Sequence, residues 1–182
     1  ISSTVESTDS VVTLTRARLP WLLIGLVGGI LGARVIEMYE GDLQLYPEMA
    51  FFIPLIAAMG GNAGVQSSAI IVQGLANNSL GFTGMFAKLS KEFLVGLLNG
   101  FVCSSLILIY NIFFNDSWGL SLTVSAALFT VIIVATLFGT FVPLVLDKYD
   151  IDPALATGPF ITTVNDVLGL FIYFLIGHLF YI

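Results

Sequence analysis

The residue best suited to chemistry in this sequence is Asp166, an acid inside an otherwise apolar stretch near the C-terminus. It follows Pro159 by seven positions, which places it about 10 Å into a helix that begins there. A carboxylate that faced lipid at that depth would cost at least ~2.5–3.5 kcal/mol. Asp166 must therefore face a bundle interior, a partner group or water.

Small and polar residues recur at spacings of three and four around this acid, so they share one helix face: Gly158, Thr162, Asp166, Gly169 and Tyr173, with Asn165 beside them. Such a face is typical of a helix that lines a wet passage. Hard cations take oxygen ligands, and Mg²⁺ keeps several of its waters when bound, whereas Zn²⁺ prefers His and Cys. Mg²⁺ is our first choice, and Mn²⁺, Co²⁺ or Ca²⁺ could use the same site. A structural carboxylate, paired or protonated, is the alternative.

A second polar segment lies at residues 60–66, where three glycines surround Asn62 and Gln66 follows. Glycines cost about 1 kcal/mol each in an ordinary helix, but membrane helices tolerate them where they pack tightly or line a water-filled cavity. Asn62 and Gln66 are four apart and share a face, from which their amides could hydrogen-bond the waters of a hydrated ion. Contact between helices is the alternative explanation.

The composition indicates that these residues sit in a membrane. Hydrophobic residues make up 57% of the 182 residues and charged residues only 10%, against roughly 25% in soluble domains. The net charge of −6 argues against nucleic acid as a partner. The single cysteine, Cys103, excludes an intrachain disulfide, and we interpret it as an inert thiol.

Five windows are long and apolar enough for membrane-spanning helices, which need about 20 residues. We expect an all-α membrane protein with helices near residues 19–38, 48–76, 89–114, 121–146 and 159–182. The first helix would open at Pro20, and the second would be interrupted at Pro54 and at Gly60-Gly61. Residues 1–18 are interpreted as the remnant of a cytosolic linker, and residues 19–182 as the transmembrane pore domain.

Basic residues near helix ends predict the orientation in the membrane. Five of the six gather on one side, which we assign to the cytoplasm: Arg16, Arg18, Lys88, Lys91 and Lys148. The protein would then be a multi-pass inner or plasma membrane protein with a cytoplasmic N-terminus and an external C-terminus. The external loops are acidic, which would attract cations, although ordinary solvation explains these charges equally well. We interpret His178, near the outer end, as an interfacial side chain.

The motifs resemble the MgtE family of magnesium channels, which is related to eukaryotic solute-carrier magnesium transporters. The resemblance spans all five helices. Its specific parts are the segment from Pro54 to Gln66, with its GGNAG core, and the run from Asp152 through Pro159 to Asp166 and Gly169.

The resemblance implies a homodimer with its pore on the two-fold axis, lined by the second and fifth helices. It implies that Asp166 and a backbone carbonyl of Thr162 bind hydrated Mg²⁺, with Asn62 and Gly158 lining the pore. We add Gln66, Asn165 and Gly169 as pore-lining residues from the helix faces described above. Family members usually carry cytosolic regulatory domains ahead of the first helix, which this chain lacks.

We therefore expect divalent cation transport, Mg²⁺ first, by a dimeric ion channel rather than an enzyme. A Mg²⁺ exchanger coupled to a counter-ion is the alternative on the same site. Two symmetry-related aspartates could also form a protease-like dyad, but the surrounding residues match no familiar protease motif. A purely structural membrane subunit would not explain the cost of Asp166.

Overall fold

The computed structural model describes residues 10–77, 84–114, 117–156 and 158–180. Within these ranges the chain is helical and has no strand, which confirms the expected all-α fold. Five helical segments are long and apolar enough to cross a membrane. The protein is therefore a multi-pass membrane protein.

The long helices are α1 (Val11–Met38), α3 (Ile53–Ala76), α4 (Met85–Phe114), α5 (Trp118–Lys148) and α6 (Pro159–Phe180). Three short elements connect them: α2 (Glu40–Leu45) and the 3-10 helix η2 (Pro47–Phe52) between α1 and α3, and the 3-10 helix η3 (Pro153–Ala156) before α6. The second membrane span combines η2 with α3.

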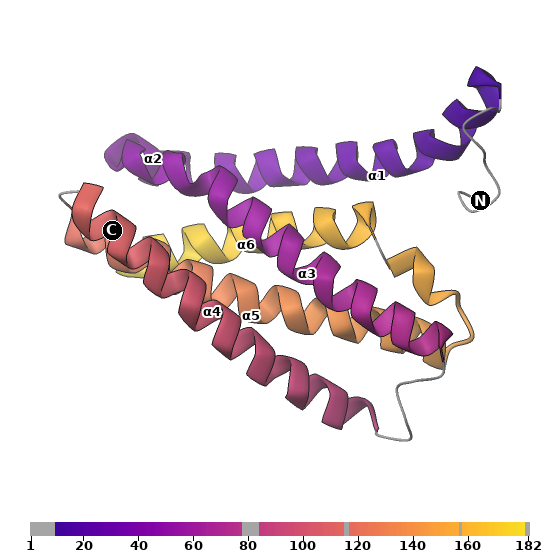
Figure 1. Cartoon of the computed structure of the whole chain (residues 1–182). Helices are drawn as coiled ribbons and strands as arrows, with labels where there is room; N and C mark the ends of the chain where they lie inside the picture. The colour runs from indigo at the N-terminus through magenta and orange to yellow at the C-terminus, as the bar shows by residue number, and fades with distance from the viewer. Residues whose placement is uncertain (1–9, 78–83, 115–116, 157, 181–182) are drawn as a thin grey trace.

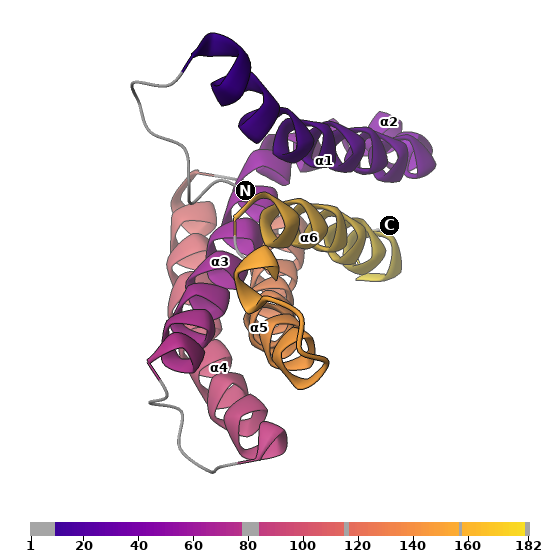
Figure 2. The ribbon, with the colours of Figure 1, turned by 90° about the vertical axis from the view of Figure 1, so that its right-hand side faces the viewer.

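The first helix begins at Val11 rather than near Leu19, so the predicted start of this helix is wrong and residues 11–18 are helical. Ser10 caps the helix, because its hydroxyl oxygen accepts a hydrogen bond from the backbone N–H of Thr13 at 3.3 Å. Pro20 consequently lies inside α1 and not in its first turn. Proline kinks a helix interior, and Figure 2 shows the first turns of α1 set at an angle to the rest. Residues 1–9 lie outside the described ranges.

The expected interruption of the second span at Gly60-Gly61 is also wrong, because α3 continues through both glycines. Pro54 lies in its first turn, where the missing N–H does no harm. The structure starts α4 four residues earlier and extends α5 by a few residues at each end. In α6 the described helix ends at Phe180, and residues 181–182 lie outside the described ranges.

The helices form a row in the order α1, α6, α5, α4, and α3 packs across α5 and α6 (Figures 1 and 2). This order makes α6 central, because α1, α3 and α5 all pack against it. By contrast, α4 is joined to the bundle chiefly through α5 and diverges from α3 toward Ala76 and Met85.

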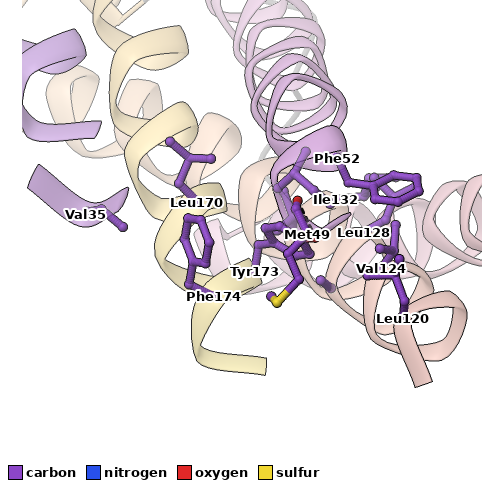
Figure 3. Close-up of a cluster of buried hydrophobic side chains, with 13 residues drawn as sticks. Val35, Met49, Phe52, Leu120, Val124, Leu128, Ile132, Leu170, Tyr173 and Phe174 are labelled. Atoms are coloured by element: carbon purple, nitrogen blue, oxygen red, sulfur yellow. Dashed lines mark hydrogen bonds between the residues drawn. The ribbon is translucent and has the colours of Figure 1, made fainter. Parts of the chain in front are cut away.

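The hydrophobic core gathers toward one end of the bundle, near α2. Figure 3 shows side chains from α1, η2, α5 and α6 meeting there, among them Val35, Met49, Leu120 and Phe174. Tyr173 is fully buried in this cluster, and its hydroxyl donates a hydrogen bond to the carbonyl of Met49 at 2.9 Å.

Candidate functional site

Asp166 lines a cavity of about 330 Å³ between α1, α3 and α6. One carboxylate oxygen, Oδ1, is buried and has no hydrogen-bond partner among the described residues. Thr163 and Leu170 on α6 share the cavity, and Ala57 contributes from α3. The wall from α1 is made almost entirely of small residues: Gly25, Gly28, Gly29, Gly32 and Ala33. We call this space the Asp166 cavity.

Two glycines allow α6 to sit as it does. A Cβ atom on Gly61 of α3 would lie 2.8 Å from Oδ1 of Asp166 and 3.1 Å from a methyl carbon of Thr162. A Cβ atom on Gly28 of α1 would overlap the methyl group of Thr163. Real Cβ atoms essentially never come so close to such atoms. The missing side chain of Gly61 therefore leaves room for the carboxylate, and that of Gly28 leaves room for Thr163.

The first turn of α6 is organised around Gly158, which has a positive φ of 69° that glycine adopts without strain. Its carbonyl oxygen accepts hydrogen bonds from the backbone N–H and the hydroxyl of Thr162, both at 3.1 Å. The Thr162 hydroxyl is thus engaged within the helix. The resemblance implies that the backbone carbonyl of Thr162 binds hydrated Mg²⁺, and that role does not require its hydroxyl group.

Asn165 and Gly169 lie on a different face of α6 from the Asp166 cavity. Asn165 is 1% exposed, and its amide packs against Gly64 so tightly that a Cβ atom there would overlap it. A Cβ atom on Gly169 would lie 3.3 Å from Val131 of α5 and 3.6 Å from the carbonyl oxygen of Ile56 of α3. Within one chain, both residues are placed where α6 meets α3 and α5.

Asn62 and Gln66 line a second cavity, of about 610 Å³, between α3, α4 and α5. Both side chains are exposed and have no hydrogen bond among the described residues. Because Gly61 faces Asp166 and the next residue faces the second cavity, α3 forms the wall between the two spaces. A single chain therefore does not bring Asn62 and Asp166 into the same cavity.

Sequence reasoning missed the part that α1 plays. Four glycines of α1 line the Asp166 cavity together with Thr163. His178 also has a partner that the sequence did not indicate, because its Nδ1 lies 2.9 Å from Oδ2 of Asp42 on α2. This pair ties the C-terminal end of α6 to α2, away from Asp166.

The Asp166 cavity can accommodate a cation but does not enclose one in a single chain. Among the described residues, no three His, Cys, Asp or Glu side chains are grouped to hold a metal ion. One unpaired carboxylate oxygen beside a threonine suits a hard cation that keeps most of its waters, or an ion shared with a second carboxylate. Either kind of binding would remove the cost of the unpaired charge.

The sequence matches a family model described as MgtE, divalent cation transporter, over residues 53–176. It is 38% identical over 157 residues to the magnesium transporter MgtE of Bacillus subtilis (strain 168), which covers 86% of this chain and 35% of that protein. It is 35% identical to the magnesium transporter MgtE of Enterococcus faecalis and 32% identical to that of Thermus thermophilus, each over 96% of this chain and 39% of the relative. The chain thus spans little more than a third of the length of these relatives.

Proposed function

The chain belongs to the MgtE family of divalent cation transporters, and we propose that it forms the membrane pore of a homodimeric Mg²⁺ channel. The observation that carries this proposal is the unpaired, buried Oδ1 atom of Asp166 in a membrane-spanning helix. A charge so placed is costly unless a cation or water meets it. Two copies of the chain would present two such carboxylates to one dication.

The exposed face of α3 supports a two-fold axis beside it. Ala58, Asn62, Val65 and Ala69 recur at spacings of four, three and four, and all but the half-buried Val65 are exposed. We call this face the α3 strip. Small side chains let membrane helices approach closely. If two strips face each other, Asp166 flanks the contact on one side and Asn62 lies within it.

In this arrangement the ion keeps its inner waters, which the Asp166 carboxylates bind through charge-assisted hydrogen bonds. The Thr162 carbonyl, the Asn62 amide and the Gln66 amide orient those waters, and Gly158 lines the cytoplasmic mouth. Asn165 and Gly169 contribute by holding α6 against α3 and α5. Mn²⁺, Co²⁺ and Ca²⁺ are the other ions that this site would admit.

The proposed orientation has the N-terminus in the cytoplasm, so that the inside-negative membrane potential drives a dication inward with about 4.6 kcal/mol per 100 mV. The bundle end near α2 would then face outward, where Glu40, Asp42 and Glu48 attract cations. Cytosolic regulatory domains are part of the proposal as partners, since the curated relatives are much longer than this chain.

Replacing Asp166 with Asn tests the proposal, because the variant keeps the shape of the side chain and removes its charge. In liposomes that contain a Mg²⁺-sensitive dye, we expect Asp166→Asn to abolish Mg²⁺ uptake. Asp147→Asn, which removes an exposed carboxylate at the end of α5, should leave uptake unchanged. Normal uptake by Asp166→Asn would refute the proposal.

The same assay separates a channel from an exchanger. A channel carries Mg²⁺ down its own gradient, and the uptake rate follows an imposed membrane potential with no other ion gradient present. If uptake requires a gradient of Na⁺ or H⁺, a coupled exchanger replaces the channel, although the role of Asp166 stays the same.

A further inference from the structure

The second cavity contains a carboxylate that the proposed pore does not use. Glu92 of α4 lines it together with Asn62 and Gln66 of α3 and with Asn99 of α4. Glu92 is partly buried, and it forms no ion pair or hydrogen bond among the described residues. The three amide side chains are exposed to the cavity and likewise form no hydrogen bond among the described residues.

The lack of partners distinguishes these side chains from the hydroxyl groups of the bundle. Ser90, Ser104 and Thr130, for example, donate to carbonyls of their own helix. Such local hydrogen bonds lower the free-energy cost of a hydroxyl group in a membrane. Glu92, Asn62 and Asn99 have no such bonds. Polar groups in a membrane span need a partner or water. The second cavity therefore requires a polar occupant.

The position of Glu92 places this occupant at one end of the membrane. α4 has 30 residues and is about 45 Å long, whereas the hydrocarbon core is about 30 Å thick. Glu92 lies seven residues after Met85, about 10 Å from the start of α4 and so near the edge of the hydrocarbon. Asn99 lies about 10 Å deeper. The second cavity thus leads from the membrane edge toward the α3 strip.

The chemistry of the lining favours a cation. Carboxylate and amide oxygens are ligands that hard divalent cations accept, directly or through water. Lys91 also lines the cavity, but it is exposed, and its long side chain can direct its ammonium group into water. Glu92 is shorter and partly buried, so its charge stays with the cavity. Residues at adjacent helix positions do not face each other, and no ion pair joins these two.

We propose that the second cavity is a cation site, in which the Glu92 carboxylate and the oxygens of Asn62, Gln66 and Asn99 hold a hydrated divalent cation as it leaves the pore on the cytoplasmic side. This inference rests on the proposed function, because Asn62 connects the second cavity to the α3 strip and hence to Asp166. Each chain contributes a complete site of this kind, whereas the Asp166 site is shared by two chains.

The difference in stoichiometry provides the test. Mn²⁺ bound to the purified protein is counted from the loss of the electron paramagnetic resonance signal of free Mn²⁺. Glu92→Gln should lose one bound Mn²⁺ per chain and retain the ion that depends on Asp166. Asp166→Asn should lose one Mn²⁺ per dimer and retain the ions at Glu92. Lys91→Gln should tighten binding at Glu92 about threefold to tenfold, because it removes a positive charge that lies at the exposed rim of the cavity and repels the ion.

The two hypotheses fail in different ways. If Glu92→Gln binds as many ions as the wild type, with the same affinities, the second site is refuted while the Asp166 site stands. If Asp166→Asn is the variant without effect, the pore proposal fails and the second site is retained. Should Glu92→Gln not fold, Lys91→Gln decides, because unchanged Mn²⁺ affinity in that variant overturns the inference. A lipid headgroup in the second cavity would also overturn the inference. In that case Glu92→Gln and Lys91→Gln would leave Mn²⁺ binding unchanged, and would alter only how the melting temperature depends on added phosphatidylethanolamine.

Discussion

At the scale of single residues, the position of one carboxylate oxygen depends on an absent side chain. Asp166 is held beside α3 because Gly61 offers no Cβ atom, and the same glycine accommodates the methyl group of Thr162. Ion sites need their ligands held within about 0.5 Å of the productive geometry. Gly61 is therefore a positioning residue for the proposed ion site, although it supplies no ligand of its own.

Gly61→Ala tests this role, because the new Cβ atom would lie 2.8 Å from Oδ1 of Asp166. The carboxylate must turn away, at a cost of about 1 kcal/mol for an off-rotamer side chain. We expect weaker Mn²⁺ binding at the Asp166 site in a folded protein. Gly41→Ala on α2 is the control, since nothing lies within 4 Å of its added Cβ atom and it does not line the Asp166 cavity. Equal Mn²⁺ affinity in both variants would show that Gly61 does not position the carboxylate.

At the scale of helices, α1 is attached to the bundle mainly through α6, and the contact depends on small residues. Most side chains of α1 are exposed, and its buried positions are few: Ala17, Gly28, Gly32 and Val35. Close approach at Gly28 brings the Thr163 methyl group against the backbone of α1. Van der Waals packing of this kind holds membrane helices together, because lipid is as apolar as the side chains.

Gly28→Ala should destabilise the α1–α6 contact by about 1–3 kcal/mol, the usual cost of overpacking. Gly29→Ala is a matched control one position away, because its added Cβ atom meets nothing within 4 Å. Thermal unfolding in detergent, followed by size-exclusion chromatography, would compare the two variants. A melting temperature for Gly28→Ala equal to that of Gly29→Ala would contradict the close packing at this position.

At the scale of the whole molecule, α3 separates two polar cavities and presents the α3 strip between them. A two-fold axis beside this strip would join the cavities into one path. The hydrophobic cluster lies toward the α2 end, and the second cavity, with the proposed exit at Glu92, lies between α3, α4 and α5.

The position of the axis can be tested by crosslinking. In a Cys103→Ser background, Ala58→Cys places a thiol on the α3 strip, and a short bis-maleimide should crosslink two chains in native membranes. Leu106→Cys is the control, because its exposed side chain lies on a different helix, α4. Dimers from Leu106→Cys and none from Ala58→Cys would place the interface elsewhere.

The sequence alone determined the membrane fold, the five spans and the family, because hydropathy and two local motifs carry that information. It also singled out Asp166, because a carboxylate inside an apolar run has a high free-energy cost in a membrane unless it meets water or a partner group. The helix ends predicted from the sequence were less accurate than the spans. α1 begins at Val11 because a serine cap and backbone bonding extended it past the apolar window, and α3 runs through Gly60-Gly61.

Only the tertiary structure decided which neighbours each helix face meets. It separated Asn62 from Asp166, brought the glycines of α1 into the Asp166 cavity, and placed Glu92 opposite the amides of α3. Sequence reasoning passed over Glu92 because the helix was expected to start near residue 89, which left this acid in its first turn. Spacing along a helix tells which residues share a face, but the partner of that face depends on packing between segments that are distant in the chain.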